Sequence, residues 1–154
     1  LLKKDLSGSK FRWLNEKLYT TTGKESFDLF TNNPEYFDIY HEGFRSQSQQ
    51  WPIKPVDRVI QLLVSSISTL EKKTIRIADL GCGEAQIAQH FTNTSSVSVS
   101  SFDLIKTNEF VTACDISNIA VGNEEFDYVI FCLSLMGTNY YDFLIEANRI
   151  LKKE

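Results

Sequence analysis

Three aspartates end predicted strands, and the first of them precedes a glycine-rich turn. Asp79 stands just before Gly81 and Gly83, and Asp103 and Asp115 close the next two apolar runs. In a parallel sheet these positions share one edge, where doubly wound folds bind nucleotides. The glycines let the backbone approach a ligand closely, and Asp103 stands where a carboxylate accepts both hydroxyls of a ribose. The spacing therefore predicts a nucleoside site. Local helix caps and turns are the structural alternative for the aspartates.

The charge of the turn narrows the choice of ligand. The dinucleotide pattern G-x-G-x-x-G is incomplete because Gln86 occupies its third glycine position, and no Gly-Lys-Ser/Thr follows to form a P-loop. Asp79 and Glu84 are expected to line the turn with no Lys or Arg nearby, so a pyrophosphate would be repelled. S-adenosylmethionine carries a sulfonium, an ammonium and a ribose but no phosphate. The acidic edge favours that cofactor over NAD.

The cysteines and histidines give weaker evidence of a functional role than the aspartates do. Cys132 closes the fourth apolar run, but no His lies near it in sequence, so a packed or cofactor-lining thiol is favoured over a nucleophile. His41 stands among aromatic residues and, taken alone, is better explained as structural than as functional. The three cysteines are far apart and form no C-x-x-C pair, which argues against a disulfide framework or a structural zinc site. We expect no metal.

The elements that position these residues change character near residue 70. The first 70 residues predict helices. A capping box is expected at Thr22 and Glu25, a helix with Asn33 as N-cap and Pro34 at its first position should stop near Gly43, and another helix should start at Pro55. The remainder alternates strands and helices, which predicts an α/β fold with a parallel, Rossmann-like sheet. The predicted strands are 75–80, 97–102, 111–114 and 126–133, and the predicted helices are 85–91 and 139–151. The second of these helices is expected to carry Tyr141, Leu144, Asn148 and Leu151 on one side. We expect a helical cap (1–70) and a core (71–154) in one structural domain.

Composition and charge limit the class of protein. The 154 residues are 42% hydrophobic and 23% charged, which is typical of a single globular domain. No apolar run approaches the roughly 20 residues that span a bilayer, so no membrane association is expected. Residues 1–76 carry 12 basic and 9 acidic side chains, whereas residues 77–154 carry 4 and 11. This difference fits two electrostatic roles, although ordinary surface variation also produces such differences.

The residues of the turn belong to a longer resemblance. Asp79-Leu80-Gly81-Cys82-Gly83 resembles the first motif of class I S-adenosylmethionine-dependent methyltransferases. More specific segments are similar to the ribosomal RNA-processing methyltransferase family that includes nucleomethylin. Those segments are 8–16, 40–44, Trp51-Pro52 and 131–139, continued by 142–149. The resemblance covers nearly the whole chain.

The resemblance implies a residue set for the cofactor. S-adenosylmethionine would be held by residues from the cap, the turn and the ends of the strands. These are His41, Asp79, Gly81, Gly83, Asp103, Asp115, Ile116 and Cys132. Ile116 departs from the methionine common in the family, but both side chains can pack on adenine. No catalytic residue is assigned, since N1 of an unpaired adenine has a free lone pair and needs positioning more than a strong base.

The resemblance also implies a substrate and a location. The family methylates N1 of an adenine in large-subunit ribosomal RNA, in the nucleus and nucleolus, and the base must be unpaired or extruded. Lys10, Arg12 and Trp13 lie in a basic first helix that either contacts RNA or is simply amphipathic. A non-catalytic, cofactor-binding module with chromatin-associated partners is the alternative function. Seven strands are usual in class I sheets and four are predicted, so we expect an incomplete sheet with strand 126–133 at an exposed edge.

Overall fold

A four-stranded parallel sheet forms the centre of the computed structural model, which describes residues 2–70 and 74–153. The strand order is β3-β2-β1-β4. The strands are β1 (Ile75–Leu80), β2 (Val97–Asp103), β3 (Val111–Ala113) and β4 (Tyr128–Ile130). Each neighbouring pair is parallel, with Ile75 opposite Val97 and Ile77 opposite Tyr128. The predicted α/β class and strand number are confirmed.

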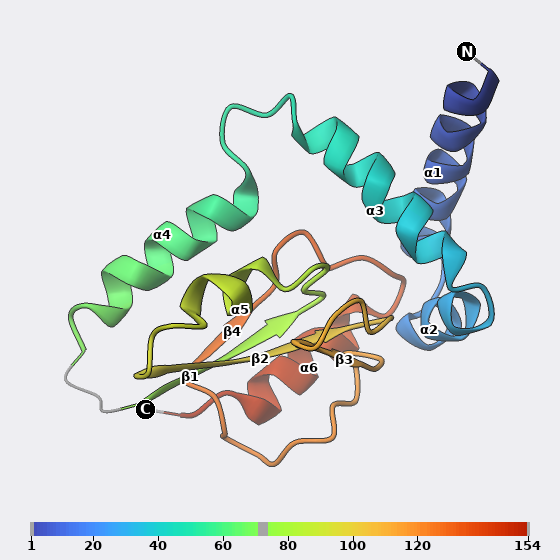
Figure 1. The fold of residues 1–154 in the computed structure, drawn as a ribbon. Coiled ribbons are helices and arrows are strands. Elements are labelled where there is room, and N and C mark those ends of the chain that lie inside the picture. The colour runs from blue at the N-terminus through green and yellow to red at the C-terminus, as the bar shows by residue number, and fades with distance from the viewer. Residues whose placement is uncertain (1, 71–73, 154) are drawn as a thin grey trace.

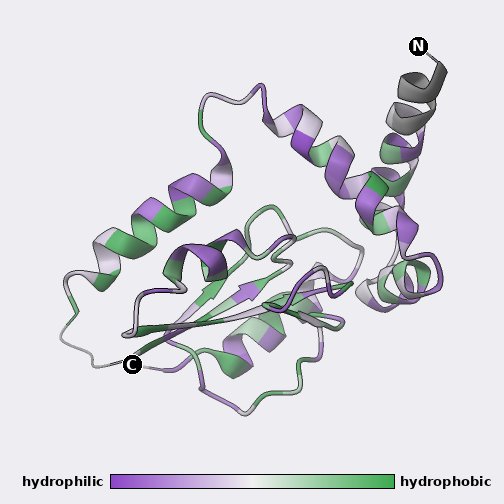
Figure 2. Cartoon of the chain, viewed as in Figure 1, coloured by the Kyte–Doolittle hydropathy of each residue, from purple (hydrophilic) through white to green (hydrophobic). Residues whose placement is uncertain are grey.

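Helices cover both faces of this sheet (Figure 1). α4 (Pro55–Ile67) and α5 (Gln86–Phe91) lie on one face, and α6 (Tyr140–Ile150) lies on the other. Side chains alternate along β1, so Ile75 and Ile77 pack with α4 and α5, whereas Leu80 packs with α6. Figure 2 shows the apolar side of α4 turned toward the sheet. The core thus consists of two apolar layers, one on each side of the strands.

Three helices form a cap over the carboxyl edge of the sheet. They are α1 (Leu2–Thr20), α2 (Gly23–Asn32) and α3 (Glu35–Ser48). They share an apolar core, separate from the two layers of the sheet, that consists of Phe11, Leu14, Leu18, Phe30, Phe37 and Tyr40. α3 lies between α1 and the strands, so it is the cap helix that faces the site (Figure 1). The capping box predicted at Thr22 and Glu25 is present.

The start and end predicted for α3 were both wrong. Asn33 does not cap it, because the Asn33 side-chain amide donates to Leu29 O and so closes α2, and Pro34 takes the N-cap position. The helix also does not stop near Gly43 but continues to Ser48. A Cβ on Gly43 would lie 2.4 Å from ring atoms of Phe11. The glycine therefore permits close packing of α1 on α3 rather than ending the helix.

The fourth strand and the last helix also differ from prediction. β4 covers only Tyr128–Ile130, since Phe126 makes an isolated bridge to Leu151 and Leu133 adopts a left-handed conformation with φ of 59°. The predicted apolar stripe of α6 included Tyr141 and Leu144, yet both are exposed. The helix instead buries Phe143, Glu146, Ala147 and Ile150. β4 lies at one edge of the sheet, as predicted.

Candidate functional site: a pocket between the cap and the sheet

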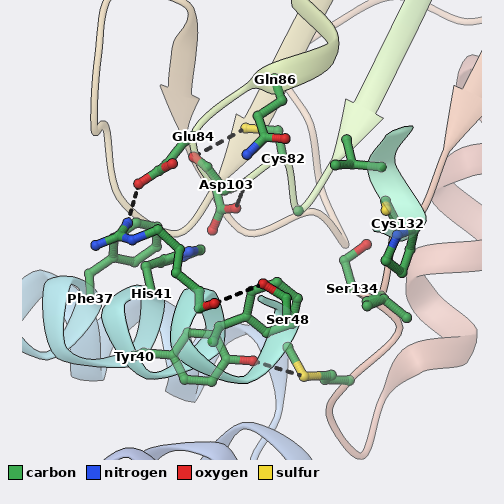
Figure 3. Close-up of a pocket in the computed structure, with 18 of the residues that line it drawn as sticks. Phe37, Tyr40, His41, Ser48, Cys82, Glu84, Gln86, Asp103, Cys132 and Ser134 are labelled. Atoms are coloured by element: carbon green, nitrogen blue, oxygen red, sulfur yellow. Dashed lines mark hydrogen bonds and ion pairs between the residues drawn. The ribbon is translucent and has the colours of Figure 1, made fainter. Parts of the chain in front are cut away.

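A pocket of about 240 Å³ lies between α3 and the carboxyl edge of the sheet (Figure 3). Its walls come from the glycine turn after β1, the end of β2, the segment after β4, the α3 helix and the start of α4. Six of the eight residues predicted for the cofactor line it. They are His41, Asp79, Gly81, Gly83, Asp103 and Cys132. His41 and Cys132, which are 91 positions apart in sequence, thus meet at one pocket.

The glycine turn is confined on two sides. Gly81 and Gly83 both adopt positive φ, of 77° and 59°, which side-chain-bearing residues rarely tolerate. A Cβ on Gly81 would lie 2.2 Å from the Ser134 Cβ, and a Cβ on Gly83 would lie 3.1 Å from the His41 ring. The Ser134 hydroxyl also donates to Leu80 O at 2.5 Å. Glycine is therefore required here by both backbone conformation and space.

Asp79 is a buried carboxylate with an unused acceptor. It is 2% exposed, and its Oδ1 lacks a hydrogen-bond partner among the described residues. The Ser101 hydroxyl, in register with Asp79 on β2, is also unpartnered within the described part of the chain. Burial, followed by the negative charge of Asp103, raises the pKa of Asp79 to about 7. A ligand that brings a cation or a hydrogen-bond donor would satisfy this carboxylate.

Asp103 is buried as well, but the backbone holds it. Its Oδ2 accepts from Gly83 N–H at 2.6 Å and its Oδ1 from Leu104 N–H at 2.7 Å. Burial raises the pKa of Asp103 to about 6, even though these two hydrogen bonds lower it. Each carboxylate oxygen has a second lone pair, so Asp103 can still accept hydrogen bonds from a ligand. The predicted ribose acceptor thus lies at the pocket with a fixed orientation.

His41 joins an aromatic wall on α3. Its ring centroid lies 4.1 Å from that of Phe37 and 5.4 Å from that of Tyr40. Burial, followed by the positive charge of Arg45, lowers the pKa of His41 to about 4, so the ring is neutral at pH 7. Phe37, Tyr40 and Phe44 all line the pocket, and the sequence reasoning missed their role. Their spacing of three to four residues on one helix was the available signal.

The prediction that no Lys or Arg lies near the turn was wrong. The Arg45 guanidinium on α3 pairs with the Glu84 carboxylate (Figure 3). The two residues are 39 positions apart, so only the packing of the cap on the sheet reveals the contact. Glu84 is thereby neutralised, and the buried acidic groups of the pocket are Asp79 and Asp103. Since Arg45 is engaged by Glu84, the pair does not offer a free cation to a pyrophosphate at the glycine turn. The other cation that lines the pocket, Lys54, comes from the start of α4 and not from the turn.

Two of the predicted cofactor residues do not line the pocket. Asp115 Oδ1 accepts from Ser117 N–H at 2.9 Å and lies beside Gly23, where an added Cβ would be 2.6 Å away. Ile116 is buried in the layer between the sheet and α6. The turn after β3 therefore packs against the start of α2 in this structure. The role of both residues stays a prediction from the resemblance.

The cysteines of the pocket are not activated nucleophiles. Burial, followed by the charge of Asp79, raises the pKa of the Cys132 thiol, and burial also raises that of Cys82. Both thiols are therefore protonated near neutral pH and behave as small apolar groups. Among the described residues, no group of three or more His, Cys, Asp and Glu side chains is arranged to hold a metal ion.

The basic helix α1 has one buried and one exposed side. Phe11 belongs to the cap core, as the amphipathic interpretation predicts. Lys10 and Arg12 are exposed, and Trp13 is 43% exposed, with its ring edge-on to Tyr36 and the Lys17 ammonium 5.9 Å from its centroid. A surface of cations around a partly exposed indole remains available for a partner. None of the described helices combines the length and hydropathy that a membrane span requires.

Comparison with known proteins identifies one family that matches this chain and several similar proteins. The family described as "Hypothetical methyltransferase" matches residues 1–154. Ribosomal RNA-processing protein 8 of Dictyostelium discoideum is 51% identical over 152 residues, which are 99% of this chain and 37% of the relative. The 25S rRNA (adenine(645)-N(1))-methyltransferase of Schizosaccharomyces pombe is 51% identical over 154 residues, 98% of this chain and 48% of the relative. Ribosomal RNA-processing protein 8 of Mus musculus is 42% identical, over 96% of this chain and 30% of the relative. The chain spans half or less of the length of these relatives.

Proposed function

Because the chain belongs to the family of hypothetical methyltransferases that matches its whole length, we propose that it is part of an S-adenosylmethionine-dependent ribosomal RNA methyltransferase. This membership confirms the resemblance predicted from the sequence. We assign the N1 atom of an adenine as the methyl acceptor, which is the atom named for the similar S. pombe protein. The substrate would be ribosomal RNA within the pre-ribosome, so we assign the protein to the nucleus and nucleolus.

The observation that carries the proposal is the pair of buried carboxylates beside the glycine turn. Asp103, held by two backbone N–H groups, is oriented to accept from ribose hydroxyls. The unpartnered Oδ1 of Asp79 suits the cationic methionine portion of the cofactor. Gly81 and Gly83 keep side chains away from the ligand, and His41 and Cys132 complete the walls. These groups fit an adenosyl compound without phosphates better than they fit NAD.

The proposed methyl transfer requires little acid–base catalysis from the protein. When bound, S-adenosylmethionine would supply an electrophilic methyl group to the lone pair of N1, and the carbon–sulfur bonding pair would remain on the sulfur of the product. N1 of an unpaired adenine carries no proton at neutral pH, so no general base is required. The neutral His41 and the protonated thiols agree with this. The task of the protein is to hold both reactants in line and to exclude water.

Calorimetry on the full-length protein tests the cofactor assignment. S-adenosylmethionine and S-adenosylhomocysteine should bind, and NAD should not. Asp103→Ala should weaken binding by about 1.5–3 kcal/mol, roughly 10- to 150-fold in Kd, because hydrogen bonds to a charged group are lost. Asp28→Ala, an exposed aspartate on α2, is the matched control and should bind as wild type. Binding of NAD alone would refute the assignment.

Methyl transfer is tested separately. Labelled methyl should appear as 1-methyladenine in ribosomal RNA incubated with the full-length wild-type protein, and Asp103→Ala should reduce the yield. Cofactor binding without transfer to RNA would instead support the alternative of a non-catalytic module with chromatin-associated partners.

A further inference from the structure

The loop between α3 and α4, residues 49–54, forms one rim of the pocket. Gln49 and Lys54 line the pocket, and Trp51 between them is 39% exposed. This loop joins the end of α3 to the start of α4, whereas the buried carboxylates Asp79 and Asp103 come from the ends of β1 and β2. It therefore provides a wall whose chemistry differs from that of the cofactor end.

The Trp51 ring is oriented by an aromatic neighbour. Its centroid lies 5.9 Å from that of Phe44, with the ring planes at 87°. Phe44 itself lines the pocket. An edge-to-face contact of this kind favours one orientation of the ring without covering it, which agrees with the exposure of the indole. The rim thus presents a fixed, partly exposed aromatic surface that continues the aromatic wall of α3.

Lys54 adds a positive charge to the same rim. It lines the pocket, and no ion pair joins it to a carboxylate anywhere in residues 2–70 or 74–153. Arg45, the other cation of the pocket wall, is already paired with Glu84. Lys54 is therefore the cation of this wall that remains able to bind a phosphate.

An aromatic surface beside a free cation suits one nucleotide of a single strand. A base whose Watson–Crick edge is modified must leave its stack, and stacking on a protein aromatic ring offsets part of that cost. We infer that Trp51, oriented by Phe44, is the stacking surface for the extruded adenine, and that Lys54 binds its phosphate. This inference rests on the proposed function and adds the place where the RNA base is held.

The test uses the full-length protein, an RNA oligonucleotide with one unpaired adenine, and a saturating concentration of S-adenosylmethionine for turnover. Trp51→Ala should raise the KM for RNA about 5- to 150-fold, which corresponds to the usual worth of one stacked base. RNA affinity measured with S-adenosylhomocysteine present should fall to a similar extent. Trp51→Phe should recover most of both losses. Trp51→Leu, which keeps apolar volume at the rim without a ring, should not.

The controls separate this inference from the proposed function. Ile53→Ala removes an apolar side chain of the same loop that is 61% exposed, and should leave KM unchanged. Lys54→Gln should weaken RNA binding and reduce its salt dependence.

Unchanged KM and RNA affinity in Trp51→Ala, or full activity in Trp51→Leu, would overturn the stacking role while leaving the proposed function intact. Loss of S-adenosylhomocysteine binding in Trp51→Ala would also overturn it, by showing that Trp51 supports the cofactor site. Absence of transfer by the wild type would refute the proposed function itself.

Discussion

Two carboxyl groups give the pocket its electrostatic character. Asp79 and Asp103 are both buried at adjacent strand ends, and burial is the main cause of the raised pKa of each. The two carboxyl groups differ in their hydrogen bonds. Backbone N–H groups donate to Asp103, whereas one oxygen of Asp79 has no partner in the described part of the chain. Asp79 is therefore the group whose ionisation should respond most to a cationic ligand.

Cofactor affinity should depend on pH through these two groups. A ligand that carries an ammonium prefers ionised Asp79, whose pKa is about 7, so the Kd for S-adenosylhomocysteine should rise as pH falls through 7, by up to about tenfold per unit. His41 is neutral throughout this range and should not contribute. Calorimetry from pH 5.5 to 8.5 measures the profile. Asp79→Asn should bind more weakly at pH 8 and show a flatter profile, and a wild-type Kd independent of pH would contradict this assignment.

The same groups should make the protein less stable as pH rises. An acid whose folded-state pKa is raised binds more protons when folded than when unfolded. The free energy of unfolding therefore decreases between the unfolded pKa, near 4, and the folded pKa. For Asp79 that window lies between about pH 4 and pH 7, and for Asp103 it ends near pH 6. A bound cation would reverse this effect by stabilising the ionised form.

At the level of elements, the pocket depends on how closely α1 packs against α3. Gly43 lies inside α3, and its missing side chain leaves the space that Phe11 occupies. α3 also carries His41 and the aromatic residues of the wall, so a shift of this helix would move one whole side of the pocket. A residue that the sequence suggested as a helix end is thus a packing contact.

Two glycine-to-alanine changes on helices should have opposite effects. Gly43→Ala should lower the free energy of unfolding by about 1–3 kcal/mol, because overpacking against Phe11 outweighs the better helix propensity of alanine. Gly8→Ala on α1 meets only the end of the Arg12 side chain, at 3.7 Å, and should stabilise by roughly 0.5–1 kcal/mol. Urea unfolding of the two variants measures both. A Gly43→Ala protein as stable as wild type would show that α1 and α3 are not packed this closely.

On the scale of the whole molecule, the cap lies between a basic surface and an acidic pocket. α1 lies on the outer side of α3, and the sheet lies on the inner side (Figure 1). The exposed Lys10 and Arg12 belong to the basic first half of the chain, and Asp79 and Asp103 to the acidic second half. We therefore propose that the exposed cations of α1 also contact the RNA substrate. The side chains of Lys3 and Lys4, counted in the same basic stretch, lie outside the described part.

The salt dependence of RNA binding should show whether the basic surface of α1 contacts RNA phosphates. Replacing Lys10 and Arg12 together by Gln should weaken binding and reduce the slope of log K against log salt by about 1.4 if both contact phosphates of a single strand. Filter binding of the full-length protein at several salt concentrations measures the slope. Glu16→Gln, on the same helix, is the control and should not reduce it. An unchanged slope in the double variant would remove α1 from the RNA interface.

The parts of the site that depend on residues close together in the chain could be predicted from the sequence. A short strand with Asp79 near its end, a turn with two glycines and a second strand ending in Asp103 are local patterns, and parallel strands bring their ends to one edge. The groups from distant parts of the chain that join them became visible only in the fold. It brought Arg45 to Glu84 and Trp51 to the rim, turned Asp115 toward α2, and exposed the side of α6 that carries Tyr141 and Leu144. These outcomes follow from how the helices pack on the sheet. Contacts between residues far apart in the chain cannot be predicted from the spacing of residue types along the sequence.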